Sequence, residues 1–213
     1  MAQLILPLPH RDAMGRDDFI VAPGNRAAFD YLDAFPAWSV PALALFGPPA
    51  SGKTHLAHVW AEKAGAVLVE ARDLKEPVPG AVVVENVDQG VGDESALFAL
   101  MERGGPLLLT GRTPPSQWKA HLPDLISRYR ALIAFELGAP DEALLHQLAV
   151  KLFADRQLLV PEKVVTLLVA QLERSPGSLR DFIARADAIA LERQVPINVQ
   201  LLRALMEDST SAS

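Results

Sequence analysis

The stretch Gly47-Pro48-Pro49-Ala50-Ser51-Gly52-Lys53-Thr54 matches the phosphate-binding loop pattern G-x-x-x-x-G-K-[ST] at every defined position. The two glycines of such a loop allow successive backbone N–H groups to converge on phosphates. Its lysine brings positive charge to the outer phosphates, and its threonine hydroxyl can coordinate Mg²⁺. We therefore expect ADP or ATP to bind here with Mg²⁺, in contact with Gly47, Pro48, Ala50, Ser51, Gly52, Lys53, Thr54 and the adjoining His55.

The segments on either side of this loop fit the strand–loop–helix context that such loops require. Residues 42–46 read as a buried strand and residues 54–64 as the helix that follows. Further short apolar runs predict parallel strands, covered on both faces, at 66–69, 81–84, 106–110 and 132–135. Because these runs alternate with helical stretches, we expect a doubly wound parallel α/β sheet.

The chain divides into four predicted parts. Residues 1–18 carry Pro, Gly and mixed charge without a periodic pattern, which predicts a flexible arm. Residues 19–138 form the predicted α/β base domain. Residues 139–206 show apolar residues at helical spacing, which predicts a small helical lid packed around its own core. The polar residues 207–213 predict a disordered tail.

Composition limits the classes of function. No apolar run of the 213 residues approaches the ~20 needed to span a bilayer, and prolines interrupt the N-terminus, so we expect neither a membrane span nor a signal peptide. The absence of cysteine excludes disulfides and thiolate chemistry and fits the cytoplasm. A net charge of −6 without a Lys/Arg cluster disfavours direct, sequence-specific DNA binding. Any link to DNA should run through a protein partner.

An acidic residue follows the apolar run 81–84. Proteins with this loop commonly hold Mg²⁺ through such a residue, which makes Glu85 the candidate metal ligand, acting through water. The next position, where active ATPases commonly place a carboxylate, carries Asn86, whose amide cannot take a proton from water. We therefore expect weak hydrolysis by the isolated chain. Asp88 is a nearby substitute, but we expect it to point elsewhere.

Three further polar residues are candidates for the nucleotide site. Thr110 either senses the outer phosphate or caps the turn that follows it, and the sequence leaves both readings open. Arginines at 128 and 180 are, taken singly, typical of a solvated surface. Together with the phosphate-binding loop they fit a sharper scheme: Arg180 folds onto the nucleotide with the lid, and Arg128 projects into a neighbour's site as an arginine finger.

The order of these motifs resembles the AAA+ ATPases of the DnaA clade. The resemblance rests on the phosphate-binding loop, Glu85-Asn86, Thr110, Leu125-Ile126-Ser127-Arg128 and Gly177-Ser178-Leu179-Arg180, and spans about residues 18 to 206. It implies an AAA+ P-loop fold. The segments Asp18-Phe19-Ile20-Val21 and Gly24-Asn25 resemble the part of that clade that packs on adenine, which implies base contacts from Phe19, Val21 and Asn25. The clade usually carries Asp where this chain has Glu85, a departure that bears on Mg²⁺.

The N-terminal run Gln3-Leu4-Ile5-Leu6-Pro7-Leu8 resembles the Q-L-x-L-P-L clamp-binding peptide of regulatory members of the clade. A flexible arm can lay Leu4, Leu6 and Leu8 into an apolar groove while the Gln3 amide bonds at its rim. The resemblance implies a negative regulator of replication initiation. It would bind the DNA-loaded sliding clamp (the polymerase beta subunit), dock on DnaA–ATP and stimulate hydrolysis there through Arg128. Members of this group are thought to act in the ADP-bound form.

Two alternatives follow from the same residues. An autonomous AAA+ ATPase would form a nucleotide-dependent homo-oligomer and lose turnover with Lys53→Ala. A helicase loader would bind the replicative helicase or single-stranded DNA and would give residues 3–8 no role. The lack of an evident surface that combines aromatic and basic residues disfavours the loader.

Overall fold

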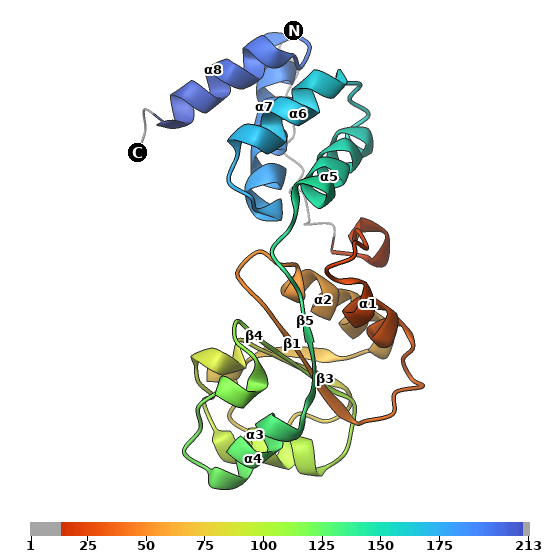
Figure 1. Cartoon of the computed structure of the whole chain (residues 1–213), viewed down its shortest axis with the longest axis vertical. Coiled ribbons are helices and arrows are strands. Elements are labelled where there is room, and N and C mark those ends of the chain that lie inside the picture. Colours follow the sequence, from red (N-terminus) through yellow and green to blue (C-terminus); the bar gives the residue numbers. More distant parts are fainter. Residues whose placement is uncertain (1–13, 211–213) are drawn as a thin grey trace, which may run out of the picture.

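The computed structural model, which describes residues 14–210, is built on a five-stranded parallel sheet (Figure 1). The strands lie in the order β2-β3-β4-β1-β5, and every neighbouring pair is parallel. The predicted doubly wound sheet is therefore confirmed. Their bounds are β1 Ala42–Phe46, β2 Val67–Glu70, β3 Val82–Glu85, β4 Leu107–Gly111 and β5 Ile133–Glu136.

Alternate residues of the central strands face two separate layers of helices. Leu43, Val83 and Leu108 pack with α1 (Arg26–Asp33) and α2 (Lys53–Ala64). Their neighbours Ala44, Val84 and Leu109 pack with α3 (Glu94–Glu102) and α4 (Pro123–Ala131) on the other face. Because both faces are buried, the strands carry uninterrupted apolar runs instead of alternating patterns. Four 3-10 turns connect these elements: η1 Arg16–Asp18, η2 Ala71–Asp73, η3 Val87–Gln89 and η4 Pro115–Gln117.

The C-terminal third is a separate helical layer, the lid, which lies above the base in Figure 1. It consists of α5 (Glu142–Asp155), α6 (Glu162–Gln171), α7 (Pro176–Arg193) and α8 (Val199–Thr210). The predicted helical stripes meet in a core of their own that includes Leu148, Phe153, Leu168, Ile183 and Leu202. Within residues 14–210, no helix combines the length and the apolar character needed to cross a membrane.

Two expected boundaries are wrong. Residues 14–18 are not part of a free arm, because η1 is held by contacts to His55 and Lys151 that no local pattern reveals. Residues 207–210 are helical, since α8 continues to Thr210 past the point where the apolar stripe stops. Residues 1–13 and 211–213, including the clamp-binding candidates Gln3, Leu4, Leu6 and Leu8, lie outside the described residues.

Candidate functional site

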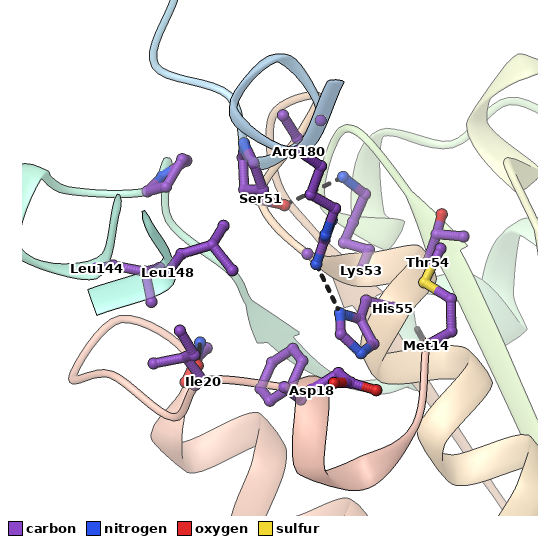
Figure 2. A pocket seen from close by; sticks show the side chains of 17 residues that line it. Met14, Asp18, Ile20, Ser51, Lys53, Thr54, His55, Leu144, Leu148 and Arg180 are labelled. Atoms are coloured by element: carbon purple, nitrogen blue, oxygen red, sulfur yellow. Dashed lines mark hydrogen bonds between the residues drawn. The ribbon is translucent and has the colours of Figure 1, made fainter. Parts of the chain in front are cut away.

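A cleft lies where the base, the lid and the segment after residue 14 meet (Figure 2). Its cavity volume is about 200 Å³. Ligand pockets commonly measure roughly 300 to 1,000 Å³, so we expect the lid to move outwards when a nucleotide enters. The lining residues are Met14, Asp18, Phe19, Ile20, Asn25, Ala50, Ser51, Gly52, Lys53, Thr54, His55, Pro140, Leu144, Leu148, Pro176, Gly177 and Arg180.

Backbone conformation fixes the shape of the phosphate-binding loop. Gly52 adopts φ 95°, a left-handed conformation that favours glycine, and α2 begins at the next residue. Gly47 adopts φ 149°, and a Cβ atom there would lie 2.1 Å from the carbonyl oxygen of Leu137. Leu137 is the first residue after β5, and its N–H donates to Phe46 O at 2.7 Å. The start of the loop is therefore packed directly against the start of the connection to the lid.

The ammonium group of Lys53 is held inside this loop. Its Nζ donates to the carbonyl oxygens of Gly47 at 2.9 Å and Pro48 at 2.8 Å, and to Ser51 Oγ at 3.2 Å. Burial lowers the pKa of Lys53, and the negative charge of Asp88 acts in the opposite direction. Neutral oxygens satisfy the ammonium only in part, because a charged acceptor makes a stronger hydrogen bond. A phosphate oxygen is the kind of acceptor that this position favours.

The segment before α1 forms the far wall of the cleft. Phe19 is buried and stacks on Phe29, with ring centroids 5.7 Å apart, and its ring meets the His55 ring edge-on at 5.2 Å. Asn25 lines the cleft, but its side chain holds the preceding turn: Oδ1 accepts from Ala22 N at 2.8 Å and Nδ2 donates to Ile20 O at 3.0 Å. Asn25 therefore shapes the predicted base-binding wall instead of offering free hydrogen-bonding groups.

Two contacts join the lid to the base across the cleft. Arg180 of α7 reaches His55 of α2, with 3.5 Å between Nη2 and Nδ1 (Figure 2). Lys151 of α5 donates to Asp18 Oδ1 at 2.9 Å and to Asp155 Oδ2 at 2.7 Å. Burial lowers the pKa of His55 and the Arg180 charge lowers it further, whereas the Gly15 carbonyl and Asp18 raise it. The lid position is thus set by groups that also line the cleft.

The polar residues after β3 are occupied in an unexpected way. Asn86 adopts φ 60°, and its Nδ2 lies 3.0 and 3.2 Å from the two carboxylate oxygens of Glu70, the last residue of β2. The Asn86 N–H donates to Thr110 Oγ1 at 3.2 Å. The Thr110 hydroxyl therefore ties the end of β4 to the loop after β3, and does not cap the turn at Gly111.

The residues present fit a Mg²⁺–nucleotide, with the metal held in part by the phosphates. Thr54 lines the cleft beside Lys53, and Glu85 is buried at the end of β3. The Oε1 atom of Glu85 has no hydrogen-bond partner, which suits an acceptor for a metal-bound water. Within residues 14–210, no group of three or more His, Cys, Asp or Glu side chains could hold a metal alone. The nucleotide's own oxygens would therefore have to complete the coordination.

Arg128 does not belong to this cleft. It lies on α4, at the end of the base away from the lid, with nearly half of its side chain exposed. It pairs there with Glu102 of α3, and its guanidinium carbon lies 5.8 Å from the centre of the Phe98 ring. Any role for Arg128 at a nucleotide is therefore at a site on another molecule.

The structure gathers most of the predicted binding residues. Those that line the cleft are Phe19, Asn25, Ala50, Ser51, Gly52, Lys53, Thr54, His55 and Arg180. Gly47 and Pro48 act through their carbonyl oxygens, while Val21 packs against the base core. The lid residues Leu144 and Leu148 were missed, because a helical stripe that fills a core looks the same as one that also covers a ligand.

No family model and no curated protein matches the sequence, but solved structures share its fold. Domain III of the replication initiation protein DnaA from Thermotoga maritima has a TM-score of 0.77 at 17% identity, over 94% of this chain and 98% of that one. AMPPCP-bound DnaA from Aquifex aeolicus has a TM-score of 0.68 at 17% identity, over 80% and 64%. RuvB from Thermotoga maritima, a Holliday junction branch migration motor, has a TM-score of 0.70 at 17% identity, over 91% and 71%.

These likenesses define the class: the chain has the AAA+ P-loop fold, an α/β base with a helical lid. The particular likeness to DnaA domain III extends over nearly the full length of both chains. The longer DnaA structure is only partly covered, since the chain spans 64% of its length.

Proposed function

We propose that this chain binds ADP or ATP in the cleft between base and lid. The observation that carries the proposal is the placement of two cations, Lys53 from the base and Arg180 from the lid, in one cleft beside the phosphate-binding loop. Cations on opposite sides of the cleft can neutralise a chain of phosphates more completely than one alone. The AMPPCP bound by the DnaA of Aquifex aeolicus supports this choice of ligand. Mg²⁺ would be held by the phosphates, by Thr54 and, through water, by Glu85.

We further propose that the chain is a negative regulator of replication initiation, like Hda, the regulatory inactivator of DnaA. Its arm, Gln3 to Leu8, would bind the DNA-loaded sliding clamp in the cytoplasm, and Arg128 would act on ATP bound to DnaA. Support comes from the clamp-peptide pattern of the arm and from the exposure of Arg128.

The surroundings of Arg128 suit a finger that acts in trans. Its ion pair with Glu102 is exposed on both sides, and such pairs contribute only about 0 to 1 kcal/mol. Releasing the guanidinium to a partner therefore costs little. In a DnaA nucleotide site it would stabilise the charge that develops on the transferred phosphoryl group.

The decisive test is binding to the purified sliding clamp by surface plasmon resonance. Wild-type binding that is lost in a Gln3→Ala, Leu6→Ala double variant would establish the arm as the clamp ligand. Ile5→Ala is the matched control, because position 5 is the unspecified residue of the Q-L-x-L-P-L pattern. An intact wild type that does not bind the clamp would contradict the regulatory proposal.

The autonomous AAA+ ATPase is the second candidate, and the carboxylate of Asp88 is the observation that favours it. It lies close enough to Lys53 for its charge to act on that ammonium. Nucleotide-dependent assembly into a homo-oligomer, with steady turnover in the absence of clamp and DnaA, would support this candidate. A helicase loader would instead be identified by binding to the replicative helicase with residues 3–8 deleted.

A further inference from the structure

Asn86 occupies the usual position of the water-activating carboxylate, and it is committed elsewhere. Its amide nitrogen is 3.0 Å from one oxygen of Glu70 and 3.2 Å from the other. An amide has no basic site at neutral pH, and here its N–H₂ group already has an acceptor. Any hydrolysis in this cleft therefore needs a proton acceptor other than Asn86.

The chain turns sharply after Asn86 and brings the next acidic side chain back toward the phosphate-binding loop. The left-handed conformation of Asn86 leads directly into η3, and Asp88 lies in the middle of that turn. This corrects the expectation that Asp88 points elsewhere, because its negative charge acts on Lys53. The left-handed turn is what a reading of the sequence spacing alone leaves out.

The carboxylate of Asp88 combines burial with access to water. Its Oδ1 atom is buried and has no hydrogen-bond partner. The residue as a whole is half-buried and lines a second cleft, of about 930 Å³, together with the segment 116–121 and α4. A buried acceptor without a donor is unfavourable unless a ligand or a bound water supplies one.

We propose that Asp88 is the proton acceptor for hydrolysis of ATP bound in this cleft, a role that Asn86 cannot fill. The proposal rests on the proposed nucleotide binding. A water oxygen attacks the γ-phosphorus while its proton passes to the Asp88 carboxylate. The bond between the γ-phosphorus and the β–γ bridging oxygen breaks, which yields ADP and inorganic phosphate. Asp88 then releases its proton to solvent through the second cleft. Glu70 is a positioning residue, since it holds the turn that orients Asp88.

The test compares wild type with Asp88→Asn, an isosteric change that removes the basic group. We expect single-turnover ATP hydrolysis to fall at least roughly tenfold, because general-base catalysis commonly contributes 10²- to 10⁴-fold. Affinity for a fluorescent, non-hydrolysable ATP analogue should change by less than about threefold, given that Asp88 does not line the nucleotide cleft. Asp73→Asn, at an exposed acid of η2, is the matched control and should hydrolyse like wild type.

Stability separates a catalytic role from a structural one. Loss of an unpaired buried charge should leave the thermal midpoint of Asp88→Asn equal to or above that of wild type. Hydrolysis by Asp88→Asn at the wild-type rate would overturn the proposal, and so would a wild type that binds ATP without any turnover. In both cases the proposed nucleotide binding would stand. A wild type that binds no nucleotide would overturn the two together.

Discussion

Arg180 and His55 meet across the cleft, with 3.5 Å between Nη2 of the guanidinium and Nδ1 of the imidazole. The other ring nitrogen of His55, Nε2, lies 3.2 Å from the carbonyl oxygen of Gly15. Both contacts are satisfied by one neutral tautomer, in which Nε2 donates to Gly15 and Nδ1 accepts from Arg180. A second proton on the ring would place a cation against the guanidinium. The contact between lid and base therefore depends on a neutral histidine.

Lowering the pH should loosen this contact. Burial first, and then Arg180, lowers the pKa of His55, so the folded chain resists protonation that the unfolded chain accepts near its ordinary value of 6.5. Stability is thus complete above that value and declines as the pH falls below it toward the folded pKa. Among its neighbours, His58 acts in the same direction as Arg180, and Asp18 opposes both. Urea unfolding between about pH 7.5 and pH 5.5 should show the decline, reduced in His55→Gln.

The Arg180→Ala variant should bind ADP roughly tenfold or more weakly, because a hydrogen bond to a charged group contributes about 1.5 to 3 kcal/mol. Titration with a fluorescent ADP analogue measures the effect. Arg193→Ala, at the exposed end of the same helix, should bind like wild type. Equal affinity of Arg180→Ala and wild type would exclude a phosphate contact from the lid.

Gly47→Ala should damage both stability and nucleotide binding. Its Cβ atom would lie 2.1 Å from the carbonyl oxygen of Leu137, so the backbone would have to shift. We expect a loss of about 2 kcal/mol or more in the free energy of unfolding, measured by denaturant titration. Gly24→Ala is the control, because a Cβ atom there meets nothing within 4 Å. A Gly47→Ala protein as stable as Gly24→Ala would show that the loop is not packed as described.

Arg128→Ala should separate binding from stimulation. The variant should keep its fold, its nucleotide and its clamp affinity, since only an exposed ion pair with Glu102 is lost. Stimulation of DnaA hydrolysis by the clamp-loaded protein should disappear, because an arginine finger contributes roughly 10³- to 10⁵-fold. Release of phosphate from DnaA–ATP is the measurement. Arg130→Ala, two residues along the same exposed helix, serves as the control, and unchanged stimulation by Arg128→Ala would rule out the finger.

The strands were predicted well because buried parallel strands carry apolar runs. Only 42–46 was predicted at its observed bounds; the other four strands each begin and end one residue later than their apolar runs. The reason is that pairing involves the backbone, which continues into Glu70, Glu85 and Glu136 after the apolar side chains stop. Hydrophobic pattern therefore locates these strands and places their ends one residue early.

The candidate site was predictable where a motif is contiguous and not where side chains meet across the fold. The loop from Gly47 to Thr54 shows its chemistry in eight adjacent letters. The bond between Asn86 and Glu70 joins residues 16 positions apart on neighbouring strands, and the contact between Lys151 and Asp18 joins residues 133 apart. Neither pair leaves a local signal, because each depends on the tertiary arrangement of the strands or of the lid.

The packing of Gly47 against Leu137 has a mechanical consequence. Leu137 begins the connection that carries the lid, so the loop that would grip the phosphates and the pivot of the lid share one van der Waals surface. A displacement of the loop by a fraction of an ångström would push on the pivot itself, where a small rotation becomes a large movement of the distant helices. The molecule would then report which ligand it holds by leverage, without a relay of intermediate side chains.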